Sequence, residues 1–345
     1  METPAPLEAF AAQFPRNARL PEQILYLLEG ATRAPSTHNS QPWRFRTTEA
    51  LLEVHRDIAL HLPASDSKGR YACISIGFLL HHIGVLGRYA GMRPELYMGG
   101  GTGTLVATIR FEKSGAFEEG ERALAAAIFR RRNRRGLFDT SRPLPHELSE
   151  VVISPAPYRP TGMPLVLPTV VTDSSVATRI GELTKETMMR LYARLAFRRE
   201  MARWITPTGS HRTDGIPGYS LNQSRVLSWV LPSVIRHFNI GKVVGSVSAA
   251  AIASAPALIA FGSQESTEEW LGIGFQASHG ILSLVTHGFD ASVFVASAEL
   301  PDVQAEATRL CGLHEPLQFL FAAGVLTGTA SWRTPRAPVA DKLMV

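Results

Sequence analysis

The chain has 345 residues, of which 45% are hydrophobic and 19% are charged, an ordinary globular balance that allows one large domain or two. Its two cysteines, Cys73 and Cys311, stand in apolar surroundings, which excludes a disulfide framework and indicates buried thiols in a reducing compartment. The net charge is +5, and residues 1–14 contain Glu2 and Glu8 without a basic region, so we expect a cytoplasmic protein with no signal peptide.

A polar loop follows the first predicted helices. Residues 1–18 have an amphipathic pattern, and a helix is predicted around residues 24–28. Pro35 and Pro42 hold the next segment open before a strand that begins at Trp43. The side chains between these points are mostly short and polar: Ser36, Thr37, His38, Asn39, Ser40 and Gln41. Such a loop can aim amides and hydroxyls at an anionic cofactor, and a polar turn without a ligand explains it equally well.

The rest of the first half reads as strands around one long helix. We expect strands at residues 43–47, 51–55, 59–62, 96–98 and 105–111, and a mostly buried helix at residues 70–91. Residues 99–103 are nearly all glycine and predict a flexible turn. This turn is not a dinucleotide-binding loop, because a strand follows it where a helix would be needed.

An internal repeat links the two halves of the chain. Ile76-Gly77-Phe78 recurs as Ile273-Gly274-Phe275, an offset of 273 − 76 = 197 residues. The same offset pairs His82 with His279. Glycine inside a buried helix permits close backbone packing, so we expect the two helices to pack tightly about a pseudo-twofold axis. The two histidines are predicted to be core or interface residues, and no metal site is expected.

Five arginines stand in the six residues 130–135, directly after a predicted helix at residues 123–129. Such a run can mark a nucleic-acid patch, a cofactor phosphate site or a solvated helix end. No aromatic residues interleave with these arginines and no nucleic-acid fold surrounds them, so we expect no nucleic-acid partner.

The remaining patterns predict a proline-rich connection at residues 155–168, a long helix at 179–204, a small-residue helix at 242–253, and strands at 257–261 and 317–322. Residues 243–262 carry no charge and are long enough to span a bilayer. Pro256 divides this stretch, so we expect neither a membrane span nor a membrane partner.

The loop APSTHNSQPW, at residues 34–43, resembles the flavin-binding loop of the nitroreductase superfamily, most closely in its Acg-like branch, where two halves lie in one chain. Four other segments carry the same resemblance: Arg131-x-Asn133-x-Arg135, Glu200 followed by Trp204, Asp214-Gly215-Ile216-Pro217, and Thr334-Pro335-Arg336. Asn133 stands where serine or threonine is usual in the family, and its side chain can still form hydrogen bonds.

The resemblance implies an α+β fold duplicated in one chain, with two mixed antiparallel sheets flanked by helices around a pseudo-twofold axis. The halves would be residues 19–120 and 121–345, with a lid insertion at about 179–236. We expect apolar residues of this insertion, including Trp204 and Trp229, to be buried over a flavin face. Because the polar loop and the arginine segment each occur once, one FMN site is expected per chain.

The resemblance also implies roles for individual residues. Arg131 and Arg336 would bind the FMN phosphate, and Arg135 would place a permanent positive charge beside the N1/C2 oxygen side of the ring. The remaining candidate cofactor-binding residues are Ser36, His38, Asn39, Gln41 and Asn133. No catalytic side chain is expected, because the flavin N5 would carry the hydride.

The function that follows is an FMN-dependent oxidoreductase of nitroreductase type, with NAD(P)H and a small organic substrate as its expected partners. A monomer is possible, because the dimer of the family is fused in one chain. The alternative is a flavin-storage or sequestering protein whose lid leaves little room for an electron donor.

Overall fold

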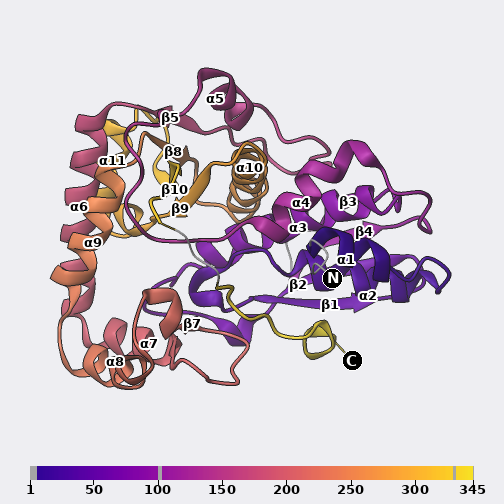
Figure 1. Cartoon of the computed structure of the whole chain (residues 1–345), viewed down its shortest axis with the longest axis horizontal. Helices are drawn as coiled ribbons and strands as arrows, with labels where there is room; N and C mark the ends of the chain where they lie inside the picture. Colours follow the sequence, from indigo (N-terminus) through magenta and orange to yellow (C-terminus); the bar gives the residue numbers. More distant parts are fainter. Residues whose placement is uncertain (1–5, 100–102, 329–331, 345) are drawn as a thin grey trace.

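The computed structural model describes residues 6–99, 103–328 and 332–344 (Figure 1). The helices are α1 Pro6–Gln13, α2 Leu20–Ala31, α3 Arg70–Tyr89, α4 Arg122–Arg130, α5 His146–Ile153, α6 Ser174–Ala193, α7 Leu195–Trp204, α8 Arg225–His237, α9 Gly241–Ala253, α10 Thr267–Thr286 and α11 Pro301–Leu310. The strands are β1 Trp43–Thr47, β2 Leu51–Arg56, β3 Glu95–Met98, β4 Leu105–Arg110, β5 Thr169–Val171, β6 Ile205–Thr206, β7 Ile216–Pro217, β8 Ala257–Gly262, β9 Asp290–Val293 and β10 Leu317–Gly324.

Two four-stranded antiparallel sheets share one topology. The strand order across the sheet is β1-β2-β4-β3 in the first sheet and β5-β8-β10-β9 in the second. When the strands of each sheet are counted by their order in the chain, both sheets have the spatial order first, second, fourth, third. In each sheet a long helix, α3 or α10, connects the second strand to the third. The predicted α+β class and its duplication are therefore confirmed.

The helices α3 and α10 cross where the repeated glycines meet. A Cβ added to Gly274 would collide with the Ile74 carbonyl oxygen, and one added to Gly77 would collide with the Leu271 carbonyl oxygen. Other positions related by 197 residues also touch each other: His81 Nδ1 lies 2.9 Å from Ser278 Oγ, and Lys68 forms an ion pair with Glu265. A residue that contacts its own equivalent lies on the axis of the repeat, so a pseudo-twofold axis passes between these two helices.

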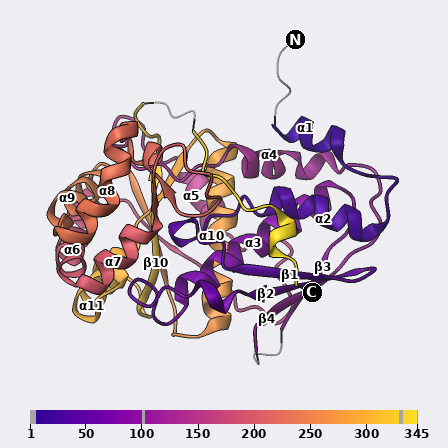
Figure 2. The same cartoon turned by 90° about the horizontal axis from the view of Figure 1, so that it is seen from below.

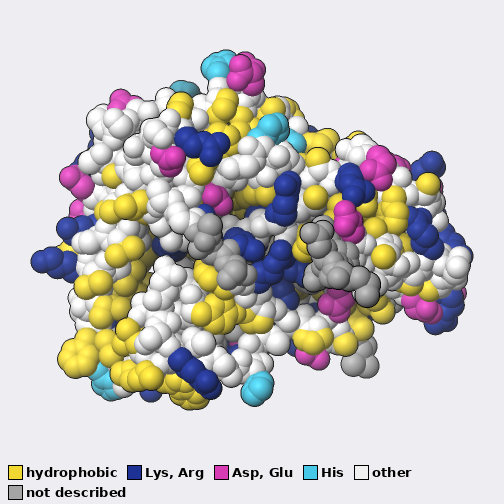
Figure 3. All heavy atoms as spheres, in the orientation of Figure 1, with side chains coloured by type: hydrophobic (Ala, Val, Ile, Leu, Met, Phe, Trp, Pro, Cys, Tyr) yellow, Lys and Arg dark blue, Asp and Glu magenta, His cyan; other side chains and the backbone are white. Residues whose placement is uncertain are grey.

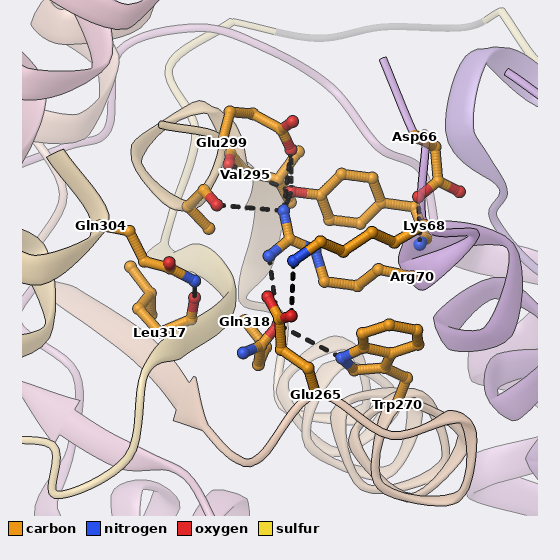
Figure 4. Close-up of polar contacts among 12 residues, drawn as sticks. Asp66, Lys68, Arg70, Glu265, Trp270, Val295, Glu299, Gln304, Leu317 and Gln318 are labelled. Carbon is orange, nitrogen blue, oxygen red and sulfur yellow. Dashed lines mark hydrogen bonds and ion pairs between the residues drawn. The ribbon is translucent and has the colours of Figure 1, made fainter. Parts of the chain in front are cut away.

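Arg70 joins the two halves beside this axis (Figure 4). From the start of α3 its guanidinium donates to Gln318 Oε1 at 3.1 Å and to the Ala298 carbonyl oxygen at 3.0 Å, and it pairs with Glu299 at 3.0 Å. Trp270 donates to the same Gln318 oxygen at 3.2 Å. Strand β10 is thus tied through Gln318 to both long helices.

The second sheet is covered on both faces, whereas the first is covered on one. Along β10, Phe319 and Phe321 join the core shared with the first half, while Leu320 and Ala322 join a second core with α6 and α9. Figures 1 and 2 show α6, α9 and α11 on the outer side of this sheet. Ile180 of α6 is fully buried there, so α6 covers the sheet.

Three predictions from the sequence are wrong in detail. Residues 58–60 form a 3-10 turn where a strand was predicted, and Asp57 caps that turn through the Ala59 amide. Residues 179–204 form two helices, because Arg194 adopts an extended conformation between α6 and α7. Trp229, predicted to be buried, is 61% exposed. Part of the predicted glycine turn, residues 100–102, lies outside the described residues.

Within the described ranges, one helix, α3, is long and apolar enough to cross a membrane, and 94% of that apolar window is buried inside the protein. The uncharged stretch at residues 243–262 divides into α9 and β8, on either side of Pro256.

Candidate functional site

The polar loop is held in a strained conformation. His38, Asn39 and Gln41 have φ angles of 54°, 56° and 54°, in the left-handed region that residues with a Cβ rarely occupy. The Gln41 amide donates to Ser36 Oγ at 2.9 Å, and the Gln41 side chain donates to the Asn39 carbonyl oxygen at 3.1 Å. Strain of this kind persists where the surroundings fix it, and it gathers at ligand-binding sites.

The C-terminal segment clamps this loop through Arg336. Its guanidinium donates to the Thr32 carbonyl oxygen at 2.8 Å, to Asn39 Oδ1 at 2.8 Å, and to the Arg33 carbonyl oxygen at 3.1 Å. The Ala337 amide donates to Gln41 Oε1 at 2.9 Å. Arg336 therefore acts as an organiser of the loop in this structure.

An arginine cluster lies beside the loop and consists of Arg33, Arg131, Arg132, Arg333 and Arg336. Among the described residues, none of the five forms an ion pair with a carboxylate, although Glu29 acts on Arg33 from a distance. Figure 3 shows Lys and Arg side chains gathered in a hollow near the middle of the face it presents.

The charges of this arginine cluster are poorly compensated. Burial, with the nearby charge of Arg333, lowers the pKa of Arg131 to about 10. Burial beside Arg131 and Arg33 lowers the pKa of Arg336 to about 9. The arginines stay protonated at neutral pH, so their mutual repulsion favours a bound anion.

Three guanidinium nitrogen atoms of the arginine cluster lack hydrogen-bond acceptors, which an anion could supply. The Nε atoms of Arg33, Arg131 and Arg132 are buried without a hydrogen-bond partner in the described part of the chain. A buried guanidinium N–H without an acceptor is costly. A phosphate group supplies several acceptor oxygens and negative charge to such a set of donors. The residues present therefore fit a phosphate-bearing cofactor such as FMN.

Arg135 lies close enough to His38 for its charge to act on the imidazole. The side chain of Arg135 is exposed, and desolvation by the surrounding protein lowers the pKa of its guanidinium. It makes long hydrogen bonds of 3.4 Å to Ser248 Oγ and to the Val293 carbonyl oxygen. Burial and the nearby Arg135 lower the pKa of His38 to about 4, so its imidazole is neutral at pH 7.

The segment at residues 195–237, which we call the lid segment, closes onto the polar loop. Glu200 on α7 accepts hydrogen bonds from the Ala64 amide at 2.9 Å and the Ser65 amide at 3.0 Å. The Ser65 hydroxyl lies 3.1 Å from His38 Nε2, and the Trp204 ring lies 6.2 Å from the His38 ring. The lid segment and the loop therefore share one hydrogen-bonded network.

The carbonyl oxygen of Thr213, also in the lid segment, meets the amides of the loop. It accepts from Gln41 Nε2 at 2.9 Å and from Asn39 Nδ2 at 3.3 Å. With the bonds to Arg336 and Ala337, both side-chain amides have protein partners on each polar atom. A flavin ring edge would have to compete for these groups, and their role toward a flavin stays a prediction.

The structure brings most of the predicted site residues together, and their roles toward a cofactor stay predictions. Ser36, His38, Asn39, Gln41, Arg131 and Arg336 meet around the loop. Asn133 lies apart and accepts from the Val293 amide at 3.1 Å, which ties the arginine segment to β9. Sequence reasoning missed Arg33, Arg132 and Arg333, although each stands directly beside a predicted motif.

A cavity of about 280 Å³ touches the loop at Thr37 and Ser40 and extends to Asp57 and Lys68. None of the clustered arginines lines it. The case for a ligand therefore rests on the arginine cluster.

No family model matches the chain. The Mycobacterium tuberculosis protein named "Putative NAD(P)H nitroreductase acg" is 36% identical over 107 residues, which are 30% of this chain and 32% of that protein. The "Uncharacterized protein Rv3127" of the same organism is 33% identical over 120 residues, 32% of this chain and 34% of that protein. The chain spans about a third of the length of these curated relatives. The resemblance predicted from the sequence is confirmed over these segments.

The solved structures that resemble the chain are more distant in sequence. The FMN-dependent nitroreductase NfnB from Mycobacterium smegmatis in complex with NADPH is 16% identical, with a TM-score of 0.41, over 66% of this chain and 99% of that one. A nitroreductase with bound FMN from Bacteroides fragilis is 15% identical, with a TM-score of 0.39, over 62% of this chain and 95% of that one. At these scores the neighbours assign no role to any residue of this chain.

Proposed function

We propose that this chain, an Acg-like relative of the nitroreductase superfamily, binds one FMN between its halves and acts as an FMN-dependent oxidoreductase. The observation that carries the proposal is the arginine cluster with three unpartnered Nε atoms beside a strained polar loop. The loop lies in the expected first half, residues 19–120, and the arginine segment at residues 131–135 lies in the expected second half. The proposed site therefore takes residues from both halves.

In this proposal Arg131 holds the phosphate with Arg33 and Arg132, whose unpartnered N–H groups need acceptors. Bound FMN would supply hydride and electron transfer to a small organic substrate, with NAD(P)H as the donor. Arg135 places a permanent cation at the ring end, where it stabilises negative charge and so favours reduction.

His38 contributes a neutral hydrogen-bonding group beside Arg135. The Ser65 hydroxyl donates to Glu200, so its oxygen accepts from His38 Nε2. This leaves His38 Nδ1 as an acceptor. A neutral His38 adds no second positive charge to that of Arg135.

A second function, storage or sequestration of the flavin, is favoured by the contacts of the lid segment. Thr213 and Trp204 both lie against the polar loop, which restricts entry of a nicotinamide donor. The two functions differ in one measurement under anaerobic conditions. An oxidoreductase is reduced by NADPH at a rate that supports turnover, whereas a storage protein is reduced by dithionite and only slowly by NADPH.

The first test is an FMN titration of the Arg131→Gln variant. We expect one FMN per chain in the parent protein. In the variant, affinity should fall by roughly 10- to 100-fold, because a charged hydrogen bond contributes about 1.5–3 kcal/mol. Arg130→Gln is the matched control, since Arg130 is exposed at the end of α4 and should leave affinity unchanged. Two FMN per chain, or equal affinities in all three proteins, would contradict the proposal.

A further inference from the structure

The helices α8 and α9 expose an unusual number of large apolar side chains. We call this surface the α8–α9 face, and its apolar members are Val226, Leu227, Trp229, Val230, Phe238, Val243 and Val247. Val226 is 77% exposed, and Phe238 is 65% exposed. Isolated exposed apolar residues are ordinary, whereas a contiguous group of them marks a contact surface.

Helical spacing places these residues on the outer side of each helix. On α8, Val226, Trp229 and Val230 follow the i, i+3, i+4 pattern of one helix face, while Ser228 and Ile235 are buried on the other. On α9, Val243 and Val247 are one turn apart, and Gly245 packs inward against Lys185. The outward apolar stripe is therefore a regular feature of both helices.

This face also carries positive charge without negative charge. Residues 215–264, which include α8 and α9, contain three basic residues, Arg225, Arg236 and Lys242, and no acidic residue. On α8 and α9 themselves, Arg225, Arg236 and Lys242 are exposed.

The picture agrees with this distribution. Figure 3 shows hydrophobic side chains gathered over the corner of the molecule where Figure 1 places α8, with basic and histidine side chains at the margin. An aromatic and aliphatic centre with a cationic border is the composition of a surface that lies in the headgroup region of a bilayer.

We propose that the α8–α9 face docks on an anionic lipid surface, with Trp229 and the neighbouring valines in the interface and Arg225, Arg236 and Lys242 against acidic headgroups. A second copy of the chain fits this face less well, because a twofold contact would bring two positively charged faces together. A nucleic acid would meet the cations but leave the exposed valines and Phe238 without an apolar partner. The proposal revises the expectation of no membrane partner, because that expectation concerned a spanning segment.

The experiment is flotation of the full chain with vesicles of phosphatidylcholine alone or mixed with phosphatidylglycerol. We expect binding to the mixed vesicles only, weakened by high salt because the attraction is electrostatic. The Trp229→Ser variant should bind the mixed vesicles about tenfold more weakly than the parent protein. The double variant Arg236→Gln, Lys242→Gln should show a loss of about the same size. Tyr97→Ser is the matched control, since Tyr97 is an exposed aromatic residue on β3, at the opposite end of the molecule in Figure 1.

A second measurement does not depend on any variant. Trp229 is the most exposed of the five tryptophans, so brominated lipids should quench the fluorescence of the parent protein if the face enters the interface. Absence of flotation with phosphatidylglycerol, or equal binding of the parent and Trp229→Ser proteins, overturns the proposal. So does a concentration-dependent dimer that Trp229→Ser abolishes, which would assign the face to a second copy.

Discussion

Arg336 differs from the other clustered arginines, because its donors are already engaged by the protein. It binds the carbonyl oxygens of Thr32, Arg33 and Ala34, and it also binds the side chain of Asn39. These bonds join the C-terminal segment to the residues that open the polar loop. The charge of Arg336 therefore stabilises the loop itself, whatever the loop binds.

We expect Arg336→Gln to lower the free energy of unfolding of the FMN-free protein by on the order of 2–4 kcal/mol, since several buried acceptors lose a charged donor. Urea unfolding measures this change. Arg333→Gln is the control, because Arg333 is an exposed residue of the same segment. A stable Arg336→Gln protein with weakened FMN affinity would instead restore the phosphate role that the sequence implied.

At the residue scale, the sequence predicts which side chains gather but not what each one contacts. The polar residues of the loop and the arginine motif do meet, as their chemistry predicts. The partner of Gln41 is the Thr213 carbonyl oxygen, 172 residues away, and no local pattern specifies such a pairing. Arg33 and Arg132 could have been found, because each adds uncompensated charge beside a predicted motif.

Among the elements, the crossing of α3 and α10 depends on two glycines. Gly274→Ala should lower the free energy of unfolding by on the order of 1–3 kcal/mol, because the new methyl group meets the Ile74 carbonyl oxygen. Gly84→Ala is the matched control within α3, since a Cβ there meets nothing within 4 Å. That control should be stabilised by roughly 0.5–1 kcal/mol through helix propensity. Equal effects of the two substitutions in urea unfolding would contradict the close crossing.

The same pair of helices makes the fold sensitive to acid. Burial, followed by the charge of Arg131, lowers the pKa of His82 from 6.5 to about 3, and burial also lowers the pKa values of His81 and His279. The unfolded chain binds these protons first, so stability is complete above pH 6.5 and is lost as pH falls toward 3. For His82 the loss is on the order of 4 kcal/mol.

His82→Gln should therefore flatten the fall in thermal midpoint between pH 6.5 and about 3, while keeping a donor for the Ala31 carbonyl oxygen. The exposed His146 supplies the control variant, His146→Gln, which should leave the pH profile unchanged. Identical profiles for the parent and both variants would exclude His82 as the source of acid sensitivity.

Element prediction succeeds where periodicity and burial agree. The long helices α3 and α10 repeat one pattern and both lie in the core, so their sequences are sufficient to find them. The break at Arg194 could not be predicted, because the helical periodicity continues across it. The exposure of Trp229 could not be predicted either, because a buried helix and a partly exposed helix can have the same apolar periodicity. Which of these occurs depends on how neighbouring elements pack, and that information is spread over the whole chain.

For the molecule as a whole, the proposed storage function requires that the lid segment restrict access to the site. Glu200→Gln replaces one acceptor oxygen with a donor that faces the Ala64 amide, so the attachment of α7 should weaken. We expect reduction of bound flavin by NADPH to accelerate about 5- to 20-fold, matching a loss of roughly 1–2 kcal/mol. Hydrogen exchange across residues 195–222 should rise in parallel.

Glu186→Gln, on the exposed side of α6, is the control for the Glu200 variant. If hydrogen exchange rises in the Glu200→Gln protein while reduction by NADPH stays slow, opening of the lid segment is not what limits the donor. The storage function would then account for the site better than turnover does.

The contacts on the pseudo-twofold axis have a consequence for the history of the chain. Lys68 meets Glu265 and His81 meets Ser278, so equivalent positions hold unlike residues that complement each other. Two copies of the first half would set lysine against lysine there, and two copies of the second would set glutamate against glutamate. Each half therefore pairs specifically with the other half, and pairing of either half with a copy of itself is disfavoured. Equivalent positions away from the axis do not meet each other, so either half can change there without a matching change in the other.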